Sequence, residues 1–176
     1  MKPDGIWANI FRYAQREESL AEILHRVPLF RELTPKELRI LEGLVHIRTY
    51  EAGEAVFVES EPGAGMYVIR SGQVDILLNH RAEEPLLLAG LAAGDFFGEM
   101  ALLADGPRSA TAISRERSEL IGFFHPDLQE IMDLHPVMGG KIAFGLAHTL
   151  AERLRYTNAQ LRDVWEIRGS HEAPAG

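Results

Sequence analysis

The 176-residue sequence contains no cysteine, and this absence excludes several kinds of chemistry. Without thiols the chain cannot form disulfides, thiolate zinc sites or cysteine nucleophiles. It also lacks the run of about 18 apolar residues that a membrane-spanning helix requires. No long apolar stretch follows the first basic residues, so we expect no signal peptide, a cytoplasmic location and no membrane partner.

Motifs of common enzyme sites are absent as well. The seven histidines form no H-x-H or H-E-x-x-H pair, and such pairs supply the metal ligands of many hydrolases. The sequence has no G-x-S-x-G elbow and no phosphate-binding P-loop. Its carboxylates are scattered over predicted turns and helices. We therefore expect no catalytic residues, no metal ion and no enzyme activity.

The charge balance restricts the partners. The net charge is −8, and a generally acidic chain binds nucleic acid poorly, so we expect no nucleic-acid partner. Acidity also repels an anionic ligand at long range, which means that a phosphate site needs local positive charge. The 46% hydrophobic and 25% charged residues are typical of one globular domain with a full core.

One segment, residues 96–112, combines features that suit a sugar phosphate. It reads FFGEMALLADGPRSATA. Gly98 has no side chain, so a ligand can approach the backbone. Residues 99–104 predict a short helix, whose first N–H groups attract an anion. Arg108 carries a planar fork of donors that fits phosphate oxygens. Glu99 would repel phosphate, so we interpret it as the acceptor for a ribose hydroxyl. We also expect it to interact with part of the Arg108 guanidinium.

This segment resembles the phosphate-binding cassette of cyclic nucleotide-binding domains. The family pattern is F-G-E-x-A-L-aliphatic, a spacer, then P-R-small-A, and F-G-E-M-A-L-L-A-D-G-P-R-S-A matches it without a gap. The resemblance implies that cyclic AMP or cyclic GMP binds through its phosphate to Arg108 and nearby N–H groups, and through its ribose to Gly98 and Glu99. The ligand-binding residues predicted within the cassette are Phe97, Gly98, Glu99, Met100, Ala101, Arg108, Ser109 and Ala110.

The choice of base stays open at this level. In the family, a threonine directly after the arginine often accompanies cyclic GMP. Ser109 offers a hydroxyl at that position but also matches bacterial cyclic AMP receptors. We therefore expect cyclic AMP, with cyclic GMP as the alternative.

Residues 1–25 predict an amphipathic helical segment. Its apolar positions are Trp7, Ile10, Phe11, Ala14, Leu20, Ile23 and Leu24. Ser19 and Glu22 have the spacing of a capping box. The aromatic face could meet a membrane or a partner, but we expect it to dock on the protein's own body, because the stripe is short and acidic residues follow it.

A second helix is predicted to start near residue 35, with Thr34 as N-cap, Pro35 at N1 and Glu37 at N3. From about residue 45 the hydrophobic period changes to two. The predicted strands are residues 45–50, 55–59, 66–70, 73–78, 86–91, 109–114 and 120–124. This pattern predicts a mainly β fold with flanking helices: a jelly-roll (double-stranded β-helix) barrel over residues 26–135. Ser60 departs from the family, which often has glycine there, and we expect this to leave the ligand contacts unaffected.

Two helices are predicted after the barrel, at residues 126–134 and from Pro136 to about Ile167. The glycines at 139, 140 and 145 predict a bend or flexible start, with Gly139–Gly140 as a candidate hinge. Heptad spacing connects Ala143, Ala147, Leu150, Leu154, Thr157, Leu161 and Val164. We expect residues 136–168 to form a dimerisation and capping helix in a homodimer; the alternative is one helix lying on the barrel. Residues 169–176 read as a disordered tail.

Thr157 and Asn158 complete the predicted site. The string RLRYTN at residues 153–158 resembles the segment of catabolite activator-type proteins in which adjacent threonine and serine touch the base. Asn158 replaces the serine but keeps a donor and an acceptor. The resemblance implies that both residues cap the base, and it leaves open whether they do so in their own chain or in the neighbouring subunit. The alternative is that Thr157 makes no contact with the base and is simply a polar residue that fits at a heptad position.

These observations predict a stand-alone cyclic nucleotide sensor that signals to an unknown effector protein through helix rearrangement. Leu102 and Leu103 would report occupancy by repacking against Leu128 and Ile131. The family's transcription factors carry a helix-turn-helix domain after the long helix, and we expect none in this protein. Two alternatives remain: a ligand-independent interaction module with the same fold, and a transcription regulator that acts without its own DNA-binding domain.

Overall fold

The computed structural model describes residues 18–103 and 106–171, and the side chains of these residues up to 162. In the described part of the chain, three short helices precede the barrel: α2 (Leu20–Arg26), the 3-10 helix η1 (Pro28–Phe30) and α3 (Pro35–Glu42). Both predicted capping boxes are confirmed, since Ser19 pairs with Glu22 and Thr34 with Glu37. The predictions for Trp7, Ile10, Phe11 and Ala14 lie outside the described residues.

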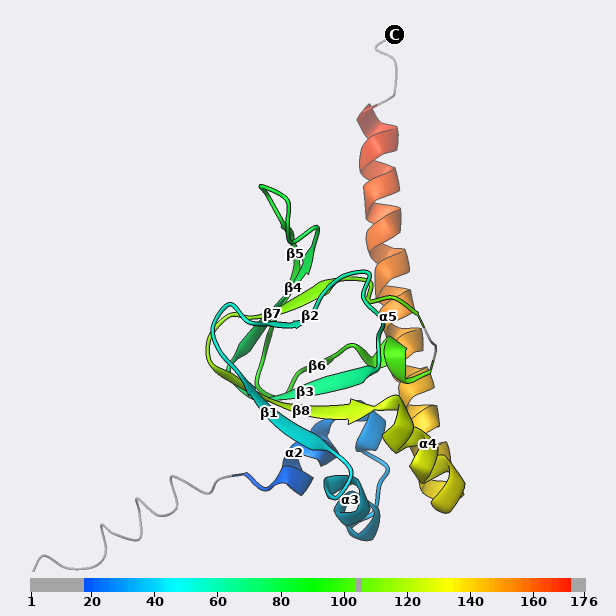
Figure 1. Cartoon of the computed structure of the whole chain (residues 1–176). Helices are drawn as coiled ribbons and strands as arrows, with labels where there is room; N and C mark the ends of the chain where they lie inside the picture. The colour runs from blue at the N-terminus through cyan, green and yellow to red at the C-terminus, as the bar shows by residue number, and fades with distance from the viewer. Residues whose placement is uncertain (1–17, 104–105, 172–176) are drawn as a thin grey trace, which may run out of the picture.

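Two antiparallel four-stranded sheets form the barrel (Figure 1). One has the order β1 (His46–Tyr50), β8 (Ser118–Phe124), β3 (Gly65–Ser71), β6 (Phe96–Phe97); the other has β2 (Ala55–Phe57), β7 (Thr111–Ser114), β4 (Gln73–Leu78), β5 (Leu86–Ala92). The predicted fold class is confirmed. Strand β6 was not predicted, because two residues are too few to show an alternating pattern.

The hydrophobic core has two parts. The larger part lies where the helices meet the first sheet, and the edge-to-face pair Phe30–Phe123, with ring centroids 5.6 Å apart, belongs to it. The smaller part fills the barrel around Ile69, Val74 and Leu120. The helices therefore rest on one sheet and leave the second sheet free to form a ligand cavity with the cassette.

Two helices follow the barrel, α4 (His125–Leu134) and α5 (Pro136–His171). Helix α5 is uninterrupted across its glycines, and the predicted bend or flexible start of this helix stays a prediction. Packing explains two of these glycines. An ideal Cβ on Gly139 would lie 2.5 Å from the sulfur of Met132, and one on Gly145 would lie 2.8 Å from the carbonyl oxygen of Leu29. The role of Gly139–Gly140 as a hinge stays a prediction.

Among the residues of α5 with described side chains, the buried ones lie in the first part of the helix. Met138, Ile142 and Leu146 are buried, whereas every residue from 151 to 162 is exposed. The helix projects beyond the barrel (Figure 1). Of the predicted heptad positions, Ala147, Leu154, Thr157 and Leu161 are exposed, Ala143 and Leu150 are half-buried, and the Val164 side chain lies outside the described set. These faces are open to a partner, and the homodimer stays a prediction.

No helix in the described part of the chain is long and apolar enough to cross a membrane. The boundaries predicted for the four chain segments (residues 1–25, 26–135, 136–168 and 169–176) also stay predictions. The larger part of the core joins the helices before and after the barrel to the first sheet.

Candidate ligand-binding site

The cassette begins where β6 ends. Gly98 has φ +79°, a left-handed conformation that suits glycine. It starts the 3-10 helix η2 (Glu99–Leu102), where the sequence predicted a short helix over 99–104. Leu102 is fully buried in the core that includes Leu128 and Ile131, and Nδ1 of His125 lies 2.9 Å from its carbonyl oxygen. Leu103 is exposed instead. The cassette is thus joined to α4 through Leu102, and repacking on ligand binding stays a prediction.

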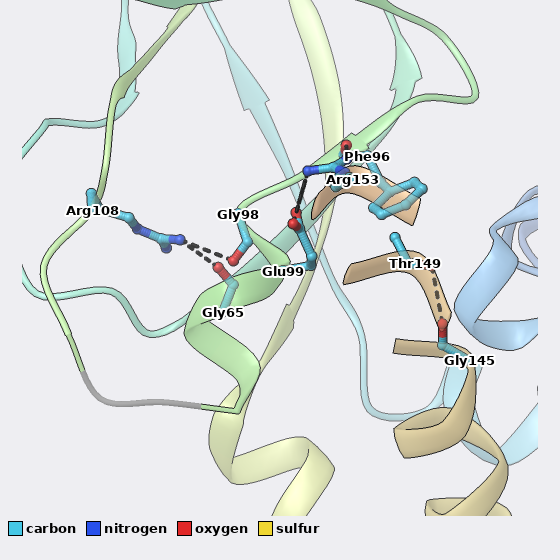
Figure 2. A network of polar contacts seen from close by, with 8 residues as sticks. All are labelled: Gly65, Phe96, Gly98, Glu99, Arg108, Gly145, Thr149 and Arg153. Atoms are coloured by element: carbon cyan, nitrogen blue, oxygen red, sulfur yellow. Dashed lines mark hydrogen bonds and ion pairs between the residues drawn. The ribbon is translucent and has the colours of Figure 1, made fainter. Parts of the chain in front are cut away.

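Arg108 lies buried, with 8% of its surface exposed. Its Nη1 donates to the carbonyl oxygens of Gly65 at 2.7 Å and Gly98 at 3.3 Å (Figure 2). Its guanidinium carbon lies 3.9 Å from the centre of the Phe57 ring. Its Nε is buried and has no hydrogen-bond partner among the described residues. Desolvation lowers the pKa of Arg108, because burial penalises the charged form.

The turn between β2 and β3 holds the backbone of Arg108. The Arg108 N–H donates to the carbonyl oxygen of Glu61 at 2.8 Å, and the Ser60 N–H donates to the carbonyl oxygen of Arg108 at 2.9 Å. Ser60 has φ +71°, the conformation that glycine adopts most easily. The expectation that Ser60 leaves the ligand contacts unaffected stays a prediction. Its turn keeps the glycine-like shape and positions the arginine.

A cavity of about 470 Å³ lies between the cassette, the second sheet and α5. This is within the range of ligand pockets, roughly 300–1,000 Å³. Its walls are mainly apolar and include all eight predicted cassette residues. They are formed by Phe57, Ile76, Ala89, Leu91, Phe96, Phe97, Gly98, Glu99, Met100, Ala101, Leu103, Gly106, Pro107, Arg108, Ser109, Ala110, Leu150 and Arg153.

Glu99 is 2% exposed, and Arg153 from α5 holds it. Nη1 of Arg153 donates to both carboxylate oxygens at 2.8 Å, and Nη2 donates to the carbonyl oxygen of Phe96 at 3.1 Å (Figure 2). The sequence predicted an interaction of Glu99 with Arg108, and no role was predicted for Arg153. No hydrogen bond joins Glu99 and Arg108 in the described structure. The available signal was spacing, because Arg153 lies seven residues after buried Leu146 on the same helix face.

Thr157 and Asn158 do not line the cavity in this chain. Both are exposed, and the Thr157 hydroxyl donates to the carbonyl oxygen of Arg153 at 3.0 Å. They lie on the part of α5 that has passed beyond the barrel. Leu150 and Arg153 are the α5 residues at the cavity. Base capping by Thr157 and Asn158 stays a prediction.

Comparison with known proteins agrees with this geometry. The family model described as "Cyclic nucleotide-binding domain" matches residues 47–135. The chain belongs to this family. The match runs from the second residue of β1 through the cassette to the end of helix α4, so the sequence resemblance is confirmed.

Three similar proteins illustrate the relationship. A cyclic AMP receptor protein of Thermus thermophilus is 34% identical over 76% of this chain and 60% of its own length. The regulatory domain of Toxoplasma gondii PKA, crystallised with cAMP, is 28% identical with a TM-score of 0.60, over 66% of this chain and 44% of that one. A cyclic nucleotide-binding domain from Methylobacillus flagellatus is 22% identical with a TM-score of 0.72, over 84% and 83%, and supports the fold alone.

The chain spans less than two thirds of the length of several curated relatives that it matches. For three of them, the matched share of the relative's own length is between 25% and 60%.

Within residues 18–103 and 106–171, no three histidine, aspartate or glutamate side chains gather as metal ligands would. The family is one of cyclic nucleotide-binding domains.

Proposed function

We propose that this protein is a cyclic AMP sensor whose ligand binds in the cavity between the cassette and α5. The observation that carries the proposal is Arg108, a buried guanidinium with an unpartnered Nε and no salt bridge within the described structure. A buried guanidinium without a hydrogen-bonded counter-charge is costly, and Glu99 acts on Arg108 only as a nearby charge that raises its pKa. An anionic ligand at this position would supply the missing acceptor and a negative charge in direct contact.

The charge of the cavity fits a phosphodiester. Its charged lining residues are Glu99, Arg108 and Arg153, which sum to +2 − 1 = +1. A cyclic phosphate carries a single negative charge, so one such group neutralises the cavity. Since Nη1 of Arg108 is engaged by two carbonyls, the phosphate would bind along the edge formed by Nε and Nη2, and the ribose hydroxyl would lie on the Glu99 side.

The apolar wall fits a nucleobase. Ile76, Ala89 and Leu91 present aliphatic surface on the second sheet, and none offers a side-chain hydrogen bond. Such a wall stabilises a base through packing. The Thermus relative carries the name "cyclic AMP receptor protein", which supports adenine as the base. Thr157 and Asn158 would then cap the base from a neighbouring subunit, because in their own chain they lie outside the cavity.

Signalling would run through α5. Ligand binding at Glu99 would alter the contact with Arg153 and so change the position of the helix. The equilibrium between two helix positions can shift only by the difference in the ligand's affinity for them. The exposed apolar face at Leu154 and Leu161 would contact a second copy of the chain, and an effector protein would read the change. The cytoplasmic location stays a prediction.

Titration calorimetry with cyclic AMP and cyclic GMP on the wild type, Arg108→Leu and Arg108→Lys tests the proposal. We expect Arg108→Leu to weaken cyclic AMP binding about 10- to 150-fold, which corresponds to about 1.5–3 kcal/mol for a charged hydrogen bond. Lysine keeps the charge but loses the two-pronged geometry, so Arg108→Lys should recover only part of the affinity.

Arg155→Ala is a matched control, because Arg155 is an exposed arginine on α5 and is not part of the cavity wall. Its affinity should equal that of the wild type. Tighter binding of cyclic GMP would overturn the choice of base. If the wild type binds neither nucleotide, the sensor proposal fails and the ligand-independent interaction module is favoured.

A further inference from the structure

The turn between β2 and β3 brings Gly63 against the cassette. An ideal Cβ on Gly63 would lie 2.7 Å from the Cβ of Ala101 in η2 and 3.4 Å from Nε of Arg108. Side-chain atoms do not approach one another as closely as 2.7 Å without displacement. Gly63 is not among the glycines with positive φ. The glycine is therefore required by the space between the turn and the cassette, and not by backbone conformation.

The turn cannot move freely to make room for a larger residue. It is tied to the segment 106–108 of the cassette by three backbone hydrogen bonds. They are Ser60 N–H to the Arg108 carbonyl at 2.9 Å, Arg108 N–H to the Glu61 carbonyl at 2.8 Å, and Gly63 N–H to the Gly106 carbonyl at 3.0 Å. A methyl group at position 63 would therefore displace η2 or the Arg108 side chain.

The free edge of Arg108 faces this contact. Two carbonyls engage Nη1 and the Phe57 ring covers one face of the guanidinium. Within the described part of the chain, Nε is buried without a partner. The edge formed by Nε and Nη2 is the one that can meet two oxygens of an anion, and Gly63 is the turn residue that lies beside it.

We propose that Gly63 and Ala101 form a spacing pair that sets how closely the turn approaches the cassette and thereby aligns the Nε–Nη2 edge of Arg108 with a phosphate. This inference rests on the proposed function. It assigns Gly63 as a positioning residue that selects for phosphate-bearing ligands over neutral nucleosides, since the base wall on β4 and β5 is made by other residues.

The test compares two ligands that differ by the phosphate. Cyclic AMP and adenosine are titrated into the wild type and Gly63→Ala, with calorimetry for the first and ligand-observed NMR for the second. We expect Gly63→Ala to weaken cyclic AMP binding about tenfold or more, because one charged hydrogen bond is misaligned. Adenosine binding should change less than about twofold, and the melting temperature verifies the fold.

Rescue separates a spacing effect from general damage. The double variant Gly63→Ala/Ala101→Gly removes the methyl on the other side of the same contact and should recover most of the cyclic AMP affinity. Ala101→Val adds bulk from that other side and should reproduce the phosphate-selective loss, even if Gly63→Ala folds poorly. Gly90→Ala is the matched control, since the nearest atom to its Cβ would be Oδ1 of Asp75 at 3.6 Å, an ordinary contact.

Three results would overturn the inference: unchanged cyclic AMP affinity in Gly63→Ala, equal losses for cyclic AMP and adenosine, or no recovery in the double variant. Each is distinct from failure of the proposed function, in which the wild type itself binds no cyclic nucleotide. The wild-type titration is therefore performed first.

Discussion

Arg153 and Glu99 form an ion pair between α5 and the cassette. Nη1 of Arg153 lies 2.8 Å from each of the two oxygens of the buried Glu99 carboxylate. The residues are 54 positions apart in the chain. This pair connects the part of the molecule that would hold a ribose to the helix that projects into solvent. It also means that Arg108 keeps its charge available for a different anion.

Removing Arg153 should destabilise the protein. In Arg153→Leu, the Glu99 carboxylate would remain buried without its counter-charge. Breaking a fully buried pair costs about 3–5 kcal/mol. Because the Arg153 side chain is 48% exposed, we expect solvent screening to reduce the loss to about 1–3 kcal/mol. Urea denaturation measures this, and Glu99→Gln/Arg153→Leu should recover part of the lost stability. If the single variant is as stable as the wild type, the ion pair has no structural role.

Two glycines of α5 should respond to alanine with opposite signs. Gly145 lies against the backbone of Leu29, so Gly145→Ala forces a backbone shift and should cost about 1–3 kcal/mol. Gly140 faces open space, and Gly140→Ala should stabilise the helix by about 0.5–1 kcal/mol. Thermal and urea unfolding of both variants measures the difference. A gain in stability for Gly145→Ala would contradict the close packing of α5 on η1.

Gly140→Ala also addresses the predicted hinge. If α5 bends at Gly139–Gly140 on ligand binding, a stiffer helix should change the cyclic AMP affinity or the ligand-induced shift in hydrogen exchange of α5. If α5 moves as one rigid element, the variant should match the wild type in both measurements. Hydrogen exchange with and without ligand therefore separates the two modes.

Ser60→Gly should stabilise the protein. A non-glycine residue in the left-handed region costs about 1–2 kcal/mol, and Ser60 has φ +71°. Glycine loses about 0.5–1 kcal/mol through greater freedom in the unfolded chain, so we expect a net gain of up to about 1 kcal/mol in urea denaturation. Asn79→Gly is the matched comparison, since Asn79 has φ +51° and asparagine tolerates this region. An equal gain at both positions would contradict the argument.

The contact between Glu37 and Lys141 should make stability depend on acid pH. Nζ of Lys141 lies 2.7 and 3.0 Å from the two carboxylate oxygens of Glu37, and this contact, with the Thr34 backbone N–H, lowers the pKa of Glu37 from 4.5 to about 2. The folded-state pKa lies below the unfolded value. The stabilisation is therefore fully present above about pH 4.5 and is lost as the pH falls towards 2.

Lys141→Met should raise the pKa of Glu37 and flatten this part of the pH profile. Melting temperatures measured from pH 2 to 6 test the prediction. Arg39→Met is a suitable control, because Arg39 is an exposed basic residue on α3 itself. A wild-type profile with no slope between pH 4.5 and 2, or an unchanged slope in Lys141→Met, would contradict the assignment.

The sequence alone determined the barrel and the cassette, because both depend on local patterns. Alternating apolar residues predict strands of the second sheet such as β4 and β5, and Thr34 with Glu37 marks the start of α3. The order of Gly98, Glu99 and Arg108 identifies the cassette, since its spacing follows the chain. Each of these patterns lies within one short segment, so it can be recognised without knowledge of any distant contact.

The tertiary structure decided which charged side chains form pairs and at which glycines there is no space for a side chain. Arg153 reaches Glu99, and Gly63 fits beside Ala101, only because packing of α5 and of the β2–β3 turn brings distant segments together. Spacing along α5 can place Arg153 on the helix face that packs inward, but it does not identify the partner that lies there. The same reason explains why Thr157 and Asn158 lie outside the cavity of their own chain. A helix that continues in a straight line leaves the barrel after Arg153, and only the folded geometry shows where that point is.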